Sequence, residues 1–156
     1  MNNKKKVIVG WQEVISLPTI GLQAIKVKVD TGAKTSSLHA ENIQYFKTGS
    51  KEYVTFDVHP VQKHKELTIR CQAELKETRD VKSSSGCQEN RPMITTNMKI
   101  GDYIFKIDLN LTKRDYMKSR MLLGRDAMKG NIMVDPENKF IHGELSDEEI
   151  ELKYKK

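Results

Sequence analysis

The segment LQAIKVKVD, residues 22–30, constrains the fold of this chain more than any other. Ile25, Val27 and Val29 alternate with lysines, which is the period-two pattern of a strand with one buried face. Asp30 ends this strand and is followed at once by Thr-Gly-Ala and further hydroxyl side chains. A carboxylate in that setting is typical either of a turn or of a catalytic acid.

Similar alternation predicts strands through most of the chain. Residues 53–60 end at a proline, which has no N–H to donate to a ladder, and residues 67–75 show a weaker strand pattern. Residues 93–111 predict a hairpin that turns at Gly101. The polar residues 76–92 indicate either a long hairpin tip or a mobile loop.

The last third of the chain predicts a short apolar strand, a glycine and a brief helix that ends near Gly130. A second hairpin is expected around residues 136–138. Ser146, with Glu149 three residues later, matches a capping box and predicts either a short terminal helix or a frayed end. Together these patterns favour an all-β, barrel-like fold.

Length and composition are those of one globular domain. The 156 residues, 37% hydrophobic and 31% charged, fit a single domain over 1–156, with 1–6 and 146–156 as peripheral tails. No apolar run approaches the roughly 20 residues of a membrane span, and no signal peptide is recognisable. The two cysteines lack CxxC spacing, which favours a reducing compartment. We therefore expect a cytoplasmic protein without a membrane partner.

The formal net charge of +6 does not specify a nucleic-acid partner. Three lysines at positions 4–6 supply half of it, and no basic stripe interleaved with aromatic residues is present. The remaining charge is mild and favours acidic partners without identifying one.

The strongest candidate for chemistry is Asp30-Thr31-Gly32-Ala33. A carboxylate can act as a general base toward water when it is held in place, glycine lets backbone approach closely, and threonine supplies a hydroxyl. The motif alone is weak, because a strand-end aspartate often accepts backbone N–H bonds in a turn. It gains weight from the apolar pair, glycine and arginine at residues 122–125, just before the expected helix.

These two motifs resemble those of retropepsin-like aspartic peptidases, in which an apolar pair and a glycine brace the Asp-Thr-Gly loop. The segments VDTGAKTSSLHA, GCQENRP, LLGRDAM and VDPENKFIHG are more closely similar to a bacterial family labelled ATP-dependent zinc protease, often encoded near a ribosomal-protein glutamate ligase. The resemblance spans about residues 6–143 and implies a closed acid-protease barrel with one short helix after LLGR. It implies Asp30, Thr31 and Gly32 as catalytic, with support from Ala33, Leu122, Leu123, Gly124 and Arg125.

The family label names zinc and ATP, but the sequence contains no motif for binding either. The four histidines lack the spacing of HExxH, and no GxxxxGK[ST] loop is present to cradle phosphates. We therefore predict no metal and no cofactor.

A single Asp-Thr-Gly is half of a catalytic dyad. The resemblance implies a two-fold homodimer in which Asp30 meets its mate, like-charge repulsion keeps one carboxyl protonated, and the other activates water. Thr31 of each chain would bridge the base of the site. The expected reaction is hydrolysis of peptide or isopeptide bonds, and the gene neighbourhood of the family suggests a glutamate-rich substrate.

Two features depart from the retroviral pattern. Lys34 stands where retropepsins usually have an acid that pairs with the late arginine, so Arg125 needs another partner, for which Asp126 or a C-terminal acid is expected. The expected flap, residues 76–92, has one glycine, Gly86, where viral flaps have several.

Weaker candidates for substrate binding also have ordinary structural explanations. Hydroxyls mostly cap turns, a lone histidine is mostly a satisfied one, and a loop arginine is mostly solvated, although its fork suits carboxylates. The five residues are Ser36, Ser37, His39, Gly86 and Arg91.

Two other classes of function compete with the peptidase. The same barrel could bind a peptide or protein partner without catalysis, with a possible link to the ligase system and a structural Asp30. A basic barrel for nucleic acid ranks last and would bind in a steeply salt-dependent manner.

Overall fold

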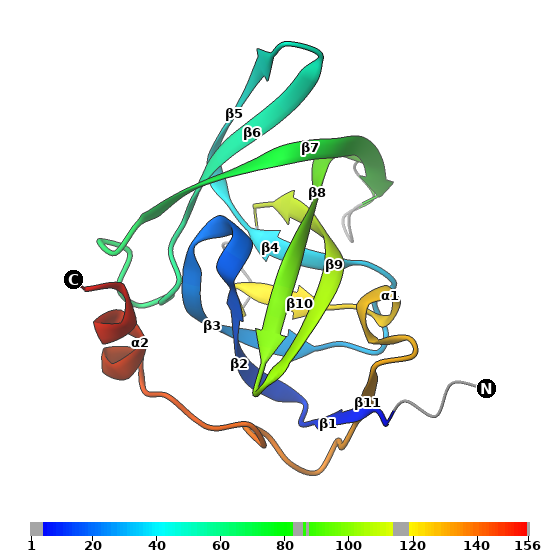
Figure 1. Cartoon of the computed structure of the whole chain (residues 1–156), viewed down its shortest axis with the longest axis vertical. Coiled ribbons are helices and arrows are strands. Elements are labelled where there is room, and N and C mark those ends of the chain that lie inside the picture. Colours follow the sequence, from blue (N-terminus) through cyan, green and yellow to red (C-terminus); the bar gives the residue numbers. More distant parts are fainter. Residues whose placement is uncertain (1–4, 83–85, 87, 114–118, 156) are drawn as a thin grey trace.

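The computed structural model describes residues 5–82, 86, 88–113 and 119–155, and most of them lie in strands. Six strands close into a barrel, in the order β2, β3, β10, β4, β9, β8 and back to β2 (Figure 1). Their bounds are β2 Gln12–Leu17, β3 Leu22–Val29, β4 Ser36–His39, β8 Gln88–Ile100, β9 Tyr103–Thr112 and β10 Met121–Leu123. The prediction of a closed all-β barrel is confirmed.

The barrel is closed by one pairing and filled by apolar side chains. Ser16 of β2 pairs with Lys99 of β8, and the 3-10 helix Pro18–Ile20 leads from β2 into β3. Side chains that alternate inward from the strands form the core, among them the fully buried Leu17, Ile25, Met98, Leu109 and Leu123. The helix α1, Arg125–Met128, follows β10 directly, as the sequence predicted.

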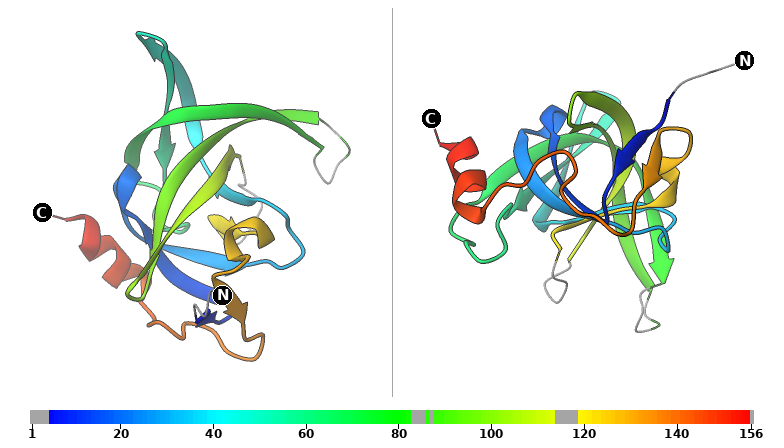
Figure 2. Two further views of the ribbon diagram at one scale, coloured as in Figure 1. Left: turned by 45° about the vertical axis from the view of Figure 1, so that its right-hand side comes forward. Right: turned by 90° about the horizontal axis from the view of Figure 1, so that it is seen from below.

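Three further strands continue the sheet beyond the barrel. They are β5 Glu41–Thr48, β6 Lys51–Val58 and β7 Ile69–Lys82, joined to the barrel through β8. The β5–β6 hairpin projects at the top of Figure 1 and at the same end in the left view of Figure 2.

Residues 76–92 mostly extend the ladder between β7 and β8. The two strands pair from Leu75 opposite Ile94 to Lys82 opposite Gln88, so these paired residues form a long hairpin and not a loop. The segment is polar because residues 76–80 are all exposed to solvent. Residues 83–85 and Cys87, expected at the hairpin tip, lie outside the described residues.

The prediction of a second hairpin around residues 136–138 is wrong. The strand β11, Ile132–Val134, pairs in parallel with β1, Val7–Val9, in a separate two-stranded sheet. A turn does follow β11, where the Asp135 carboxylate accepts a hydrogen bond from the backbone N–H of Glu137. The described residues after this turn, up to 155, form no strand, because β11 takes its partner from the start of the chain.

The C-terminal segment forms the helix α2, Asp147–Tyr154, with the predicted capping box at Ser146. Residues 146–156 were expected to be a peripheral tail, but α2 packs on the barrel: Ile150 is 1% exposed, and the Tyr154 hydroxyl donates a hydrogen bond to the carbonyl of Ala24. Among the described residues, no helix is both long and apolar enough to cross a bilayer.

One buried carboxylate joins the start of the barrel to the segment after β11. Glu13 is fully buried and accepts hydrogen bonds from the backbone N–H groups of Gly10, Ile141 and His142, at donor–acceptor distances of 2.7, 3.0 and 3.1 Å. Sequence patterns did not single out this residue.

Replacing Glu13 with alanine leaves these three N–H groups without their acceptor. Each stranded donor costs about 1–3 kcal/mol, so we expect the variant to lose about 3 kcal/mol or more. Thermal unfolding should show a Tm lower by about 6–12 °C. The exposed Glu144→Ala variant is the control, and a Glu13→Ala Tm equal to that of Glu144→Ala would contradict this role.

Candidate active site

The chain leaves β3 at Asp30 and enters a tight turn. The backbone N–H of Asp30 donates to the carbonyl of Leu123 at 2.9 Å, and the N–H of Ala33 donates to the Asp30 carbonyl at 3.2 Å. The half-buried carboxylate accepts the N–H of Gly32 through Oδ1, at 2.9 Å. Within the described residues, Oδ2 has no hydrogen-bond partner. One oxygen is therefore fixed, and the other is open to a proton, a water or another carboxylate.

The strand β10 holds both legs of this turn. It pairs in parallel with β3, which leads into the turn, with Leu123 opposite Val29. It also pairs antiparallel with β4, which leads out, with Leu122 opposite Ser37. All three residues of β10 are buried. Because one buried strand carries both legs, the position of Asp30 is set by the barrel itself.

Gly124 lies where the chain of β10 passes under the turn. A Cβ atom at this residue would lie 2.8 Å from the carbonyl oxygen of Lys34 and 2.7 Å from the carbonyl carbon of Thr35. The N–H of Gly124 donates to the Ser36 hydroxyl at 2.9 Å. Only glycine allows this close approach of the two backbones.

The start of α1 binds the outer side of the turn. The N–H groups of Arg125 and Asp126 donate to the carbonyls of Ala33 and Lys34, at 2.8 and 2.9 Å. The Arg125 guanidinium donates to the carbonyl of Thr31, at 2.9 Å. Four carbonyl and N–H groups around Asp30 therefore find partners in the segment from Leu123 onward.

The expectation of an acidic partner for Arg125 is wrong for the described residues. Asp126 lies near Lys129 instead, with 3.6 Å between carboxylate and ammonium. Lys34 cannot pair with a guanidinium, because both carry positive charge, and the carbonyl of Thr31 supplies the acceptor.

The structure places the weaker candidates on β4 away from open surface. Ser36 is 1% exposed and braces Gly124, and Ser37 is also buried. His39 is fully buried at the far end of β4, about 10 Å along the strand from Ser36, where its ring lies 3.5 Å from the Glu41 carboxylate. His39 therefore does not belong to the surroundings of Asp30.

The remaining two candidates lie on the β7–β8 hairpin. Gly86 is exposed with φ of +86°, a conformation that favours glycine. Arg91 is half-buried on β8 and lines a shallow depression of about 370 Å³ together with Tyr45 and Lys113. No residue of the Asp30 turn lines this depression.

A second depression, of about 300 Å³, does border the turn. The base of the β7–β8 hairpin, the strand β9, α1 and the chain after Asp30 all contribute to its walls. The charged and hydroxyl groups that line it are Thr35, Lys76, Arg79, Thr95, Lys106, Asp108 and Asp126.

Three cations and two carboxylates line this depression, and two of the cations, Lys76 and Arg79, already have acidic partners in Asp108 and Glu77. Asp108 accepts hydrogen bonds from Lys76 at 2.6 Å and from Thr95 at 2.8 Å. Partial burial alone would raise the pKa of Asp108, but these hydrogen bonds and the nearby cations outweigh it and hold the pKa below its usual range. Asp108 therefore stays ionised and neutralises one lysine, while Lys106 is exposed to solvent and forms no ion pair with the described residues.

Comparison with protein families identifies the group to which this arrangement belongs. Residues 8–144 match the family model of the RimB-like proteins, described as retropepsin-like aspartic endopeptidase RimB. The chain belongs to the RimB-like family. The resemblance predicted from its motifs is thereby confirmed, and so is the retropepsin-like fold.

Several longer proteins are similar to this chain. A protein from Shewanella pealeana named "Probable alpha-L-glutamate ligase" is 42% identical over 149 residues, and one of the same name from Parasynechococcus marenigrum is 44% identical over 150. Each match covers 96% of this chain but 32% of the relative. The chain thus spans about a third of the length of these relatives.

A solved structure shows the same architecture. It is that of Lpg0085, a protein with unknown function from Legionella pneumophila, with a TM-score of 0.73 and 32% sequence identity. The match covers 88% of this chain and 99% of that one.

The structure also assigns roles that sequence patterns did not indicate. Ser36 braces the turn through Gly124, although it had been considered for substrate contact. This contact left no local pattern, because the two residues lie 88 positions apart in the sequence. The depression beside the turn also had no local signal, because its charged residues come from three separate segments, β7, β9 and α1.

Substitution of Gly124 by alanine tests the close packing under the turn. The backbone of Gly124 has φ of −96°, which alanine tolerates, so the clash with Lys34 and Thr35 is the only penalty. Overpacking of this kind costs about 1–3 kcal/mol, measured by thermal or urea unfolding. Gly32→Ala is the comparison, because its Cβ would meet only the Asp30 side chain, at 3.1 Å. An equal or larger loss in Gly32→Ala would contradict this explanation.

Proposed function

We propose that the chain is an aspartic-type peptidase that hydrolyses peptide or isopeptide bonds as a homodimer, with one Asp30 from each copy. The observation that carries the proposal is the Asp30 carboxylate, which is held through one oxygen by Gly32 and has its second oxygen open. The family to which the chain belongs is described as retropepsin-like, which supports the same chemistry.

The need for a second copy follows from the number of carboxylates. An aspartic peptidase uses two of them at close range, and one turn supplies one. Thr31 and Gly32, at the tip of the turn, are exposed, so a second copy has access to them. Two carboxylates that meet there share a proton, because two like charges at short distance are unfavourable.

In the proposed reaction the ionised carboxylate takes a proton from water, whose oxygen forms a bond to the carbonyl carbon of the substrate. The protonated carboxyl of the mate donates its proton to the carbonyl oxygen. The tetrahedral intermediate then collapses, the C–N bond breaks, and the leaving nitrogen receives a proton from the dyad. The proposed mechanism forms no covalent bond between substrate and enzyme and uses two carboxylates in place of a metal ion.

An acidic, glutamate-rich substrate fits both the site and the relatives. The exposed Lys106 lines the depression beside the turn, where it would attract a carboxylate of a bound peptide. Regions similar to this chain occur in longer proteins named as glutamate ligases, which suggests a shared substrate. The reducing compartment expected from the cysteines supports a cytoplasmic location for this activity.

The second candidate is a peptide-binding module with a structural Asp30. The bond from the Gly32 N–H to Oδ1 is also what an aspartate in an ordinary turn would make. The names of the longer relatives refer to a ligase and not to a peptidase, which favours this alternative as the second choice.

The two candidates differ in their effect on peptides. Incubation with a peptide library that includes glutamate-tailed members, in EDTA and from acidic to neutral pH, should give cleavage products detectable by mass spectrometry. Asp30→Asn should lower kcat/KM by about 100-fold or more, because it removes the general acid and base. The exposed Asp102→Asn variant, at the β8–β9 turn, should cleave like the wild type.

Absence of cleavage by the wild type at every pH would favour the binding module. Equal cleavage of glutamate-tailed and plain peptides would contradict the preference for acidic substrates but would still support the peptidase.

The oligomeric state is a separate test of the dyad. Analytical ultracentrifugation at micromolar concentration, with and without peptide, should reveal a dimer. A strict monomer under both conditions would leave Asp30 without a mate and would contradict the proposed mechanism.

A further inference from the structure

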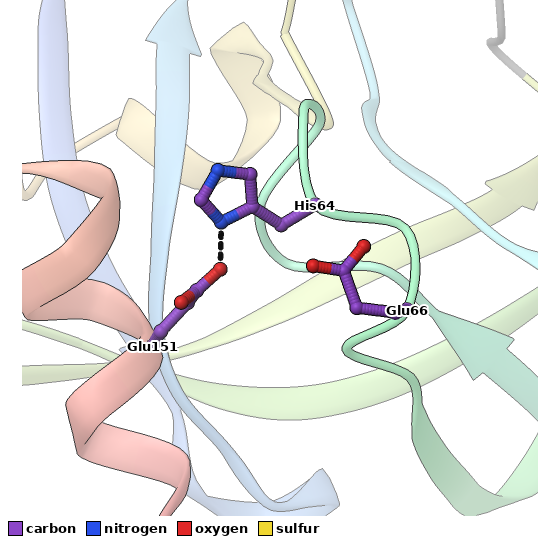
Figure 3. Close-up of side chains that lie close together, drawn as sticks. All are labelled: His64, Glu66 and Glu151. Carbon is purple, nitrogen blue, oxygen red and sulfur yellow. Dashed lines mark hydrogen bonds and ion pairs between the residues drawn. The ribbon is translucent and has the colours of Figure 1, made fainter.

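Three potential metal ligands meet on the side of the barrel where α2 packs. His64 and Glu66 lie in the turn between β6 and β7, and Glu151 lies on α2 (Figure 3). One ligand atom from each residue lies within 4.8 Å of the other two. The Nδ1 atom of His64 contacts the Glu151 carboxylate directly, and the Glu66 carboxylate faces the same space.

Both segments that carry these residues are held in place by other contacts. In the turn, the N–H of His64 donates to the Val61 carbonyl at 3.0 Å, and the N–H of Leu67 donates to the His64 carbonyl at 3.1 Å. The side chains of Val61 and Leu67 pack in one apolar cluster with Ile150, the neighbour of Glu151.

The helix α2 has two more anchors on β3. Asp147 in its first turn forms an ion pair with Lys26 at 3.2 Å, and the Tyr154 hydroxyl in its last turn accepts the N–H of Ala24 at 3.0 Å. The three side chains are therefore brought together by the fold and need little rearrangement to bind a common ligand.

The donor set indicates which ligand. One imidazole nitrogen and two carboxylate oxygens suit a divalent transition-metal ion, and zinc sites with three protein ligands leave a position for water. Calcium and magnesium prefer oxygen ligands alone. His64 and Glu151 are half-buried and Glu66 is exposed, so an ion can enter from solvent. We propose that His64, Glu66 and Glu151 form a binding site for a divalent transition-metal ion such as Zn²⁺.

This site is distinct from the peptidase centre. Ala24, which anchors α2, precedes Asp30 by six residues of extended chain, a separation of about 20 Å. The ion would join α2 to the β6–β7 turn and stabilise the packing of the C-terminal helix. No spacing motif predicted it, because Glu151 is far from His64 and Glu66 in the sequence.

Calorimetric titration of the untagged full chain with ZnCl₂ tests the proposal. We expect one bound ion per chain and, at a free Zn²⁺ concentration about 100 times the Kd, a Tm raised by about 5–10 °C. MgCl₂ at the same concentration should leave the Tm unchanged. Burial raises the pKa of Cys71 to about 12, so this thiol stays protonated and does not compete for the ion.

Three variants assign the binding to these residues. His64→Ala and the exposed Glu66→Gln should each weaken Zn²⁺ binding by about 10-fold or more, because each removes a ligand. Glu148→Gln removes a charge from the exposed face of the same helix, outside the cluster, and should bind Zn²⁺ like the wild type. Because Glu66 is at the surface, its variant remains folded even if His64→Ala does not.

Two results would overturn the site: absence of Zn²⁺ binding by the wild type, or unchanged affinity in the folded Glu66→Gln variant. Neither result affects peptide cleavage in EDTA, and loss of cleavage in Asp30→Asn does not affect Zn²⁺ titration. The proposed function and the metal site can therefore fail independently.

Discussion

The position of Asp30 depends on one short buried strand, β10, which lies between the strand that leads into the turn and the strand that leads out. A turn at the end of a strand is ordinarily free to move, since few contacts fix it. Here both legs share ladder bonds with β10, and the residues after β10 bind the turn from below and outside. A surface carboxylate thereby acquires the fixed position that general acid–base chemistry requires.

The rest of the barrel stabilises β10 and the residues after it, which hold the Asp30 turn. The strand β10 has three residues, which is too short to be stable unless both of its edges are paired and both of its faces are covered. Closure through β2 and β8 supplies that cover, and Glu13 fixes the segment after β11 to the start of the barrel. Gly124 accepts no Cβ atom without a clash, because its backbone meets that of Lys34 and Thr35.

The sequence predicted the elements whose signals are local. The alternation at residues 22–30, the turn at Gly101 and the capping box at Ser146 are written in neighbouring residues, and each is found in the structure. The pairing of β11 with β1 was missed because its partner lies more than a hundred residues away. The carbonyl partner of Arg125 was missed for a related reason: every residue has a backbone carbonyl, so the residue type does not predict which carbonyl accepts a hydrogen bond. The proposed ligands His64 and Glu151 are likewise brought together by the packing of α2 on the β6–β7 turn.

The most direct test of the central claim is a subunit-mixing experiment on cleavage. Wild type and Asp30→Asn are mixed in varying ratio at constant total concentration, allowed to exchange subunits, and assayed in EDTA. If the site is assembled from the Asp30 of two copies, the rate should fall with the square of the wild-type fraction, because only wild-type pairs hold two carboxylates. A rate that falls in simple proportion to the wild-type fraction would show that each chain acts alone and would contradict the account.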